Sequence, residues 1–568
     1  MPSQAPDDQT NDPITLEVVR NKVDGIANEM QSTLLRSSFS TVVKEGLDAS
    51  ASLFTLEGET LAQAIAIPIH LATLIPIVKT ILERFPPAEM KSGDLYIMND
   101  PYLGGTHLPD IAIIMPIFFE GKPIAISAAM THHQDVGGMS PGSVPPNAVE
   151  IYQEGIRIPP LKLRNEGMFN DTLVEMLKLN VRIPDVFMGD IGAQISACTI
   201  GARRVCELAS RYQSEKLKFI FSALLDRSEH LTRNALREIP DGTYVYQDYL
   251  DNDGVDLDKP VKICVAVTIS GDTLHCDFTG TDPQTRGPFN AVQSGSQAAA
   301  YYAVRAVTDS SIPTNGGCFR PVTLHLPKGS LVNPREPAPV NSRTATLKRI
   351  AGCIVGALRQ ASPEIVPADG ASSLLVLMFG GQVGDDRPFV VGEFNAGGSG
   401  GGPNKDGVDV IETDGSNCMN MPVEALELEA PIRVHQMRLR KDSGGAGQFR
   451  GGLGCVREIE FLSSNTALTH RGERHRHAAR GSEGGHDGSK AHSIIIRDDG
   501  SQETITSKVF TTVQRGERLI VETPGGGGFG QPSARDKSAV IDDLENGKIS
   551  LDTAHQIYGL DLSGIDQP

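Results

Sequence analysis

Apolar residues near the N-terminus recur at steps of three and four, the spacing that places side chains on one face of a helix. They begin after Asp12-Pro13, a pair typical of a helix start, and are Leu16, Val19, Val23, Ile26, Met30 and Leu34. The same periodicity returns in four later segments, 171–179, 213–238, 343–359 and 535–544. We therefore predict helices in all five places, with the first packed on the core.

Short apolar runs bounded by turn residues predict strands at 51–55, 111–119 and 124–130. Two further runs, 261–270 and 273–280, flank Gly271-Asp272 and predict a hairpin. Later in the chain, glycine-rich segments alternate with short β-like stretches; they are 397–402, 444–454, 481–488 and 525–528. This pattern indicates a loop-rich, mostly antiparallel region.

The chain of 568 residues is 39% hydrophobic and long enough for several regions around ordinary cores. We expect an N-terminal region at 12–240 that holds the candidate site, a middle α/β region at 241–370, a glycine-rich β region at 371–530, and a C-terminal helix and tail at 531–568. The 59 glycines and 36 prolines predict many turns and few long helices.

The net charge of −18, from 70 acidic and 52 basic residues, argues against nucleic acid as a partner. The most basic stretch, 471–480, alternates Arg and His with Glu473 and is interpreted as a solvated loop or a subunit contact.

The polar, acidic start has no secretory signal pattern, and no run of 18 apolar residues occurs, so we expect a cytoplasmic protein. Eight cysteines without a CxxC pair predict reduced, mostly buried thiols.

Side chains that can bind metal are densest between residues 99 and 135. His107 and Asp110 share one loop, and His132, His133 and Asp135 follow a predicted strand that returns beside it. Imidazole and carboxylate suit a borderline cation such as Zn²⁺, and a catalytic site leaves one coordination position for water. Asp48, just before another strand, is a possible fourth ligand. The alternative is a chance His-x-x-Asp, with one core and one surface histidine in the vicinal pair.

Other kinds of catalysis have less support. The glycine run 397–402 opens no helical pattern, and GxxxxGK[ST] does not occur, so any ATP is expected to bind another chain. No Gly-x-Ser-x-Gly elbow precedes a helix, and no cysteine lies beside a motif histidine. Water is therefore the expected nucleophile.

Seven segments together resemble the hydantoinase B family, which includes β subunits of N-methylhydantoinases and caprolactamase, and subunits of acetone and acetophenone carboxylases. The segments are NDPYLGGTHLPDIAI, THHQDVGGMSPGSVP, EGIRIPPLKL, NVRIPDVFMGDIGAQI, DFTGTDPQTRGPFNA, NMPVEALE and TPGGGGFG. The resemblance runs from about residue 12 to 550. It implies an α+β class, a large mixed α/β fold with a glycine-rich, mostly antiparallel β region in the C-terminal half.

The resemblance also implies a site and a partner. A divalent metal, Zn first and Mn or Fe as alternatives, is expected on Asp48, His107, Asp110 and His132, although Asp-Ala-Ser here replaces the family's usual Asp-Phe-Ser. A hydantoinase A type α subunit with an actin-like kinase fold is expected to bind ATP and Mg, to phosphorylate the substrate's carbonyl oxygen, and to form an α₂β₂ assembly. Candidates for moving the water's proton are Asp135, ranked first, then His133 and Glu45.

The implied function is that of the hydrolytic β subunit of an ATP-dependent cyclic amidohydrolase, acting on a lactam, hydantoin or oxoproline. Phosphorylation makes an amide carbon electrophilic enough for water to attack. The alternative within the family is a subunit of an ATP-dependent ketone carboxylase. A noncatalytic scaffold is a third possibility, against which the four candidate ligands argue, because a scaffold needs no convergent carboxylates and imidazoles.

Overall fold

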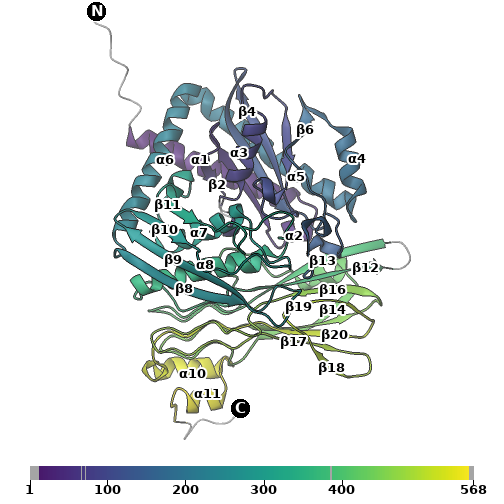
Figure 1. The fold of residues 1–568 in the computed structure, drawn as a ribbon, viewed down its shortest axis with the longest axis vertical. Coiled ribbons are helices and arrows are strands. Elements are labelled where there is room, and N and C mark those ends of the chain that lie inside the picture. The colour runs from purple at the N-terminus through teal and green to yellow at the C-terminus, as the bar shows by residue number, and fades with distance from the viewer. Residues whose placement is uncertain (1–11, 65–66, 71, 384–386, 562–568) are drawn as a thin grey trace, which may run out of the picture.

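The computed structural model describes residues 12–64, 67–70, 72–383 and 387–561. The molecule is elongated, with the N-terminal sheet and its helices at one end and the C-terminal sheets with α10 and α11 at the other (Figure 1). Helices and several antiparallel sheets are mixed along the chain, with the glycine-rich β region in the C-terminal half, so the predicted fold class is confirmed.

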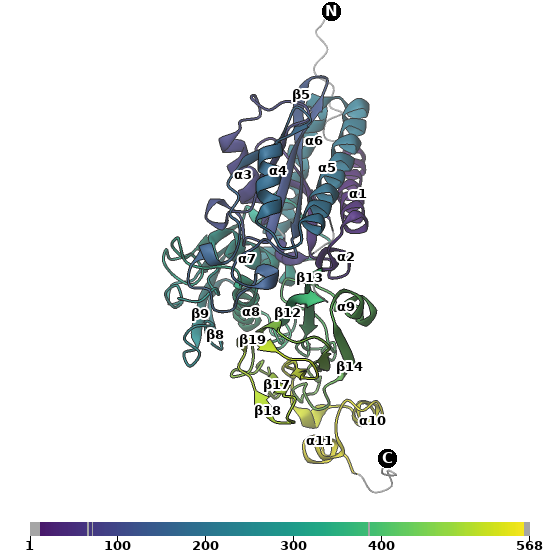
Figure 2. The same cartoon turned by 90° about the vertical axis from the view of Figure 1, so that its right-hand side faces the viewer.

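The N-terminal region is built on a seven-stranded antiparallel sheet in the order β2-β1-β5-β4-β3-β6-β7. In chain order its strands are β1 (Ala49–Phe54), β2 (Thr60–Gln63), β3 (Leu95–Met98), β4 (Asp110–Phe119), β5 (Lys122–His132), β6 (Leu161–Asn165) and β7 (Met168–Phe169). Helices α1 (Pro13–Ser37) and α5 (Pro184–Tyr212) pack on one face, and α3 (Leu74–Arg84) lies on the other (Figure 2).

The predicted helices are present. Helix α1 begins after Asp12, whose carboxylate accepts hydrogen bonds from the backbone N–H of Ile14 and Thr15 at 3.1 and 3.0 Å, and it buries the predicted Val19, Val23, Ile26, Met30 and Leu34. The other segments contain α4 (Asp171–Leu179), α6 (Ser214–Arg237), α8 (Arg343–Ala361) and α10 (Lys537–Glu545). Three short helices complete this set: α2 (Thr41–Lys44), α9 (Val423–Glu429) and α11 (Leu551–Gln556).

Besides these three short helices, two longer helices lie where no helix was predicted. Helix α5 has 29 residues, so the expectation of few long helices fails here. Its glycines weaken the sequence signal but permit close packing, since a Cβ on Gly201 would lie 2.5 Å from Met30 Sδ and 2.6 Å from Ser127 Oγ. Helix α7 (Gln293–Val307) is rich in alanine and packs against α8.

The middle region holds a four-stranded sheet in the order β11-β10-β9-β8. Its strands are β8 (Gly242–Leu250), β9 (Val261–Ser270), β10 (Thr273–Asp277) and β11 (Val322–His325). The predicted hairpin is confirmed as β9–β10, which pairs Thr273 with Ser270, while β10 and β11 run parallel. Helix α8 packs on β8 and β9.

The C-terminal half contains two antiparallel sheets, in the orders β13-β12-β16-β19 and β14-β15-β20-β17-β18. The first holds β12 (Leu374–Val383), β13 (Arg387–Ala396), β16 (Thr466–Arg471) and β19 (Lys508–Val513). The second holds β14 (Ile432–Leu439), β15 (Cys455–Phe461), β17 (His492–Ile496), β18 (Gln502–Thr504) and β20 (Arg518–Glu522). Their facing apolar side chains, among them Phe379 and Phe461, form a core of their own.

The glycine-rich segments lie against one another as extended loops. The Gly452 N–H donates to the Ser399 carbonyl at 2.8 Å, and the Gly526 N–H donates to the Gly452 carbonyl at 3.0 Å. A Cβ on Gly398 would lie only 1.9 Å from the Gly452 carbonyl oxygen, so the backbones approach too closely for any side chain. These segments are loops that hold the C-terminal half together, as predicted, and 397–402 opens no helix.

Two smaller expectations concern cysteines and membranes. All eight cysteines are free thiols and six of them are buried, which confirms that prediction. Among the described residues, no helix combines the length and the apolar character needed to cross a membrane. The proposed region boundaries stay a prediction.

Candidate metal centre

Three of the four predicted ligands lie at one end of three neighbouring strands. Asp48 immediately precedes β1, Asp110 begins β4, and His132 ends β5, which lies between β1 and β4 in the sheet. Asp110 and His132 are paired across the ladder, and the His132 N–H donates to the Asp48 carbonyl at 3.0 Å. His107, in the loop before β4, completes the group, with its ring centroid 5.0 Å from that of His132. All four predicted residues are therefore brought together.

A fifth side chain joins them that the sequence did not single out. His70 ends a short 3-10 turn, Pro68–His70, and its Nε2 lies 3.3 Å from Asp48 Oδ1. A single histidine among apolar residues is usually a core residue, and no motif surrounds His70. Only the fold shows that it faces a carboxylate.

The contact between His107 and Asp110 indicates a need for positive charge. His107 Nδ1 lies 3.0 Å from the Asn341 carbonyl oxygen, an acceptor, so this nitrogen carries a proton. Burial lowers the pKa of His107, which keeps the ring neutral. Because Nδ1 carries the proton, Nε2 has a free lone pair. That lone pair faces Asp110 Oδ1 at 3.1 Å. Two electron-pair donors this close favour a shared proton or cation between them.

The second oxygen of Asp110 is also fixed. Arg343 and Thr106 both donate hydrogen bonds to Asp110 Oδ2. Burial alone would raise the pKa of Asp110, but the adjacent His107 and the positive charge of Arg343 outweigh it and hold that pKa well below its usual value. Asp110 is therefore an anion with one oxygen directed at His107.

The pKa values of the other three members are shifted as well. Burial, with the nearby charge of Asp110, raises the pKa of Asp48 to about 7. Burial also lowers the pKa of His70 to about 4 and that of His132 well below its usual value, and both rings have an Nδ1 without a partner. Neutral imidazoles with unpaired nitrogens beside buried carboxylates are the donor set that zinc and similar ions prefer.

The donor types therefore fit a divalent cation. Within the described residues, however, no group of three or more His, Cys, Asp or Glu side chains is arranged closely enough to form a finished metal site. The five side chains instead form two close pairs, Asp48 with His70 and His107 with Asp110, and His132 lies beside both. Ligation of one ion by four of them remains a prediction.

A small cavity of about 30 Å³ opens beside the cluster, enough for about two water molecules. Its polar wall includes Asp48, His70, His132, Arg343 and Arg471, and its apolar wall includes Val144, Val376, Met378 and Phe394. The cavity thus lies between the N-terminal sheet and β12 and β13 of the C-terminal half.

The three predicted proton carriers do not line this cavity. The Asp135 carboxylate accepts from Arg182 Nη1 at 2.8 Å and from backbone N–H groups of Gly137 and Gly142. His133 points to the other face of the sheet, where its Nε2 lies 3.2 Å from Gln194 Oε1. Glu45 is half-buried just after α2. Their roles stay predictions, and a proton would reach each of them only through intervening groups.

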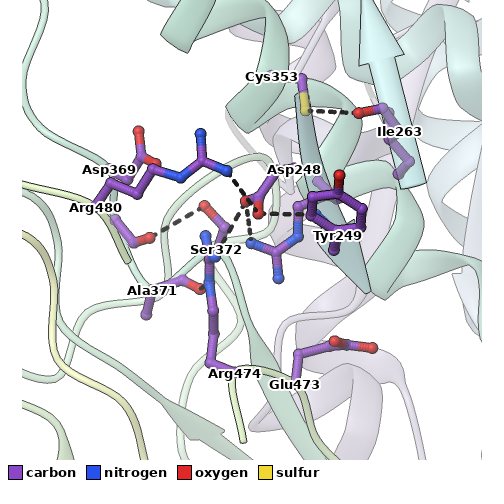
Figure 3. A network of polar contacts seen from close by, with 12 residues as sticks. Asp248, Tyr249, Ile263, Cys353, Asp369, Ala371, Ser372, Glu473, Arg474 and Arg480 are labelled. Atoms are coloured by element: carbon purple, nitrogen blue, oxygen red, sulfur yellow. Dashed lines mark hydrogen bonds and ion pairs between the residues drawn. The ribbon is translucent and has the colours of Figure 1, made fainter. Parts of the chain in front are cut away.

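The interpretation of 471–480 as a solvated loop or a subunit contact is wrong for its first half. Arg471, Glu473 and Arg474 are buried. Figure 3 shows Arg474 beside Asp248, with an Nη1–Oδ2 distance of 3.0 Å, and Arg349 donates to the same carboxylate at 2.9 Å. Arg474 is drawn inward because it neutralises Asp248, a carboxylate from the distant strand β8, and a sequence pattern does not reveal this contact.

Comparison with known proteins places this architecture in a family. Residues 12–532 match the family model described as hydantoinase B/oxoprolinase. The chain therefore belongs to the hydantoinase B/oxoprolinase family, and the resemblance seen in the sequence is confirmed.

Several relatives are similar over almost their whole length. The B-type chain of a putative D-/L-hydantoinase from Pseudomonas sp. is 33% identical, covering 98% of this chain and 96% of that protein. The beta chain of the caprolactamase from Pseudomonas jessenii is 34% identical, covering 98% and 97%. A crystal structure of the ATP-dependent caprolactamase from that organism superposes with a TM-score of 0.91 at 32% identity over 98% of this chain and 97% of that one. An acetone carboxylase structure shares the fold, with a TM-score of 0.88 at 21% identity, covering 97% and 80%.

Proposed function

We propose that this chain is the hydrolytic β subunit of an ATP-dependent cyclic amidohydrolase acting on a lactam, hydantoin or oxoproline. The observation that carries the proposal is the buried cluster of imidazoles and carboxylates at the ends of β1, β4 and β5. The near full-length similarity to the beta chain of a caprolactamase and the B-type chain of a hydantoinase supports it. A divalent metal, Zn before Mn or Fe, would be held by Asp48, His107, Asp110 and His132.

When bound, such an ion lowers the pKa of water so that a nucleophile is available near neutral pH. The chain's own residues prepare the site for it. The Asn341 carbonyl holds the Nδ1 proton of His107 and keeps Nε2 free, while Arg343 fixes Asp110. His70 orients Asp48 through their 3.3 Å contact. The apolar wall of the cavity excludes bulk water from the reacting carbon.

The activated substrate would come from a hydantoinase A type partner that binds ATP and Mg in a cytoplasmic α₂β₂ assembly. The partner transfers the γ-phosphoryl group to the amide oxygen and releases ADP. Water then adds to the amide carbon, the C–N bond breaks to free the amine, and a second water releases phosphate from the resulting acyl phosphate. One amide, one ATP and two waters give the amino acid, ADP and phosphate.

Reconstitution tests this division of labour. The chain should be incubated alone and with its partner, with ATP and a panel of lactams, hydantoins and 5-oxoproline, and the ring-opened products measured. We expect hydrolysis only when partner and ATP are both present, and no ATP turnover by the chain alone. ATP hydrolysis by the purified chain would contradict the proposal.

The second candidate is a subunit of a ketone carboxylase, favoured by the fold shared with acetone carboxylase. The same reconstitution with acetone or acetophenone and bicarbonate distinguishes them. A carboxylated product that requires bicarbonate, with no ring opening of any cyclic amide, would establish the alternative.

The ligand assignment has its own test in Asp48→Asn and Asp110→Asn. An Asp that merely caps a loop keeps most of its hydrogen bonds as Asn, whereas a ligand loses its anionic donor and much of the ion's affinity. We expect both variants to lose metal by elemental analysis. Asp135→Asn is the matched control, because Asp135 lies outside the cluster, and it should keep its metal. Full metal content in both ligand variants would place the ion elsewhere.

A further inference from the structure

Arg471 is the last residue of β16 and lies on the wall of the cavity that His132 and Asp48 also line. It is paired across the ladders with Val376 of β12 and Lys508 of β19, so the sheet fixes its backbone on both sides. Arg471 as a whole is only 6% exposed. A guanidinium is therefore held inside the protein, facing the candidate metal centre from the C-terminal half.

Among the described residues, this guanidinium has no Asp or Glu counterion. Seven arginines are buried in the described part of the chain, and six form an ion pair with Asp or Glu; these six are Arg343, Arg349, Arg450, Arg457, Arg474 and Arg535. Arg471 alone does not. Its one hydrogen bond among the described residues is from Nη1 to Ser342 Oγ, at 3.4 Å.

The charged neighbours of Arg471 do not compensate it. Burial, with repulsion from Arg343, lowers the pKa of Arg471 to about 10. Glu154 exerts the opposing influence on Arg471, but burial raises the pKa of Glu154 to about 8, so this carboxyl is mostly protonated at neutral pH. Arg343 is already engaged with Asp110. A positive charge thus remains unneutralised on the cavity wall.

An unpaired buried charge is costly, and a protein without use for it gains by replacing it with an apolar residue. A guanidinium presents a planar fork of N–H donors that matches the oxygens of a phosphate or carboxylate. The partner for such a fork is an oxyanion that enters the cavity from outside the chain.

We propose that Arg471 binds the phosphoryl group of the activated substrate and holds it beside His132. This inference rests on the proposed function, in which the phosphorylated amide is the anion that must reach the cavity. The fork would hold the phosphoryl oxygens and withdraw charge from the C–O–P linkage. Because the cavity of about 30 Å³ holds only about two water molecules, Val376, Met378 and Phe394 on its apolar wall would have to move outward to admit the ring of the substrate. The two halves of the chain then share the substrate, the N-terminal sheet supplying the metal ligands and β16 the anion-binding residue.

The direct test is calorimetric titration with inorganic phosphate of the purified chain and of Arg471→Gln, at equal metal content. A charge-assisted hydrogen-bonded pair corresponds to about a 10- to 100-fold loss of affinity when the charge is removed. Arg471→Lys, which keeps the charge but not the fork, should fall between the two. Unchanged phosphate binding in Arg471→Gln, or no binding by the unaltered chain, would overturn the assignment. Acetate is the parallel titrant, and acetate binding without phosphate binding would also overturn it.

Stability separates this role from a structural one. Removing an uncompensated charge should leave the melting temperature of Arg471→Gln unchanged or higher, whereas the matched variant Arg474→Gln removes an ion-paired arginine and should melt lower. A loss in Arg471→Gln as large as that in Arg474→Gln would mark Arg471 as structural and contradict the proposal.

The complete complex distinguishes failure of this inference from failure of the proposed function. With partner, ATP and cyclic amide, Arg471→Gln should still produce ADP but ring-open the amide at least about tenfold more slowly. Equal hydrolysis by the variant and the unaltered chain would refute the inference alone. No hydrolysis by the unaltered complex would instead refute the proposed function.

Discussion

Arg471 and Arg474 lie three positions apart in the chain, yet they occupy opposite electrostatic environments. Arg474 and Arg349 surround Asp248, and the attraction of the two arginines outweighs burial and lowers the pKa of that carboxyl far below its usual value (Figure 3). Around Arg471, by contrast, the imidazoles of His70 and His132 are neutral and burial raises the pKa values of Asp48 and Glu154, while Arg471 itself has no Asp or Glu partner among the described residues. A buried charge with a purely structural role is neutralised by another group of the chain. A buried charge without such a partner indicates a place where a ligand is expected to bind.

The largest effect on stability is expected from Asp248→Asn. It leaves Arg349 and Arg474 buried without an anion, which should cost about 3 to 5 kcal/mol of unfolding free energy. Because the folded pKa of Asp248 is depressed, the stabilisation is present above its usual pKa near 4 and is lost as the pH falls below it. Denaturant unfolding of both proteins from neutral to acid pH checks this, and a difference that stays constant with pH would contradict it.

The largest effect on activity is expected from His132→Ala. Removing a residue that orients a ligand costs about 10- to 100-fold, and loss of a ligand should cost at least as much. His470→Ala is the matched control, since His470 is buried between Ser493 Oγ at 2.9 Å and the Ser507 carbonyl at 3.2 Å, away from the cavity. We expect the control to lose stability but keep its metal. Stoichiometric metal in His132→Ala would show that His132, like His470, is not a ligand, and the contrast between the cavity region and the ion-paired core would be lost.

Glu154→Gln tests whether a buried carboxyl near the cavity also lacks a neighbouring charge that compensates it. The folded pKa of Glu154 is raised from 4.5 to about 8 by burial, so the folded chain loses stability relative to the unfolded one as the pH rises through this range. Gln does not titrate. Between the two pKa values, the free energy of unfolding of the variant should therefore rise relative to that of the unaltered chain by about 1.4 kcal/mol for each pH unit. Denaturant unfolding at a series of pH values measures this difference. Parallel stability curves would show that Glu154 is neutralised by groups around it.

The smallest effect is expected from Glu45→Gln. Glu45 is half-buried and does not line the cavity, so its replacement should change stability or the activation barrier by less than about 0.5 kcal/mol, which is about twofold in rate. Steady-state kinetics of the complex gives the answer. A much larger fall in kcat, with unchanged metal content, would make Glu45 a proton carrier after all.

The sequence predicted those features that depend on local spacing. Asp48, Asp110 and His132 were recognisable because each lies at the end of a strand whose apolar run is visible, and neighbouring strand ends lie together. The helix beginning at Pro13 followed from its periodicity and its capping Asp12.

The missing features depend on contacts between distant segments. Arg343 and Arg471 reach the cluster from α8 and β16, and His70 reaches it from a turn without a motif. Helix α5 was missed because Gly189, Gly192 and Gly201 weaken its local signal, although tertiary packing against α1 and the sheet stabilises it. The proton carriers Asp135 and His133 were placed by proximity in sequence, but His133 and His132 point to opposite faces of the strand end.

The stacked glycine segments have a consequence for biosynthesis. Backbone groups of 397–402 pair with 444–454 and 525–528, and the Gly401 N–H finds its acceptor, the Gly527 carbonyl, only when the last of these segments is present. During synthesis the first segments leave the ribosome long before 525–528 does. The glycine loops of the C-terminal half therefore lack part of their hydrogen bonding until nearly the whole chain has been made.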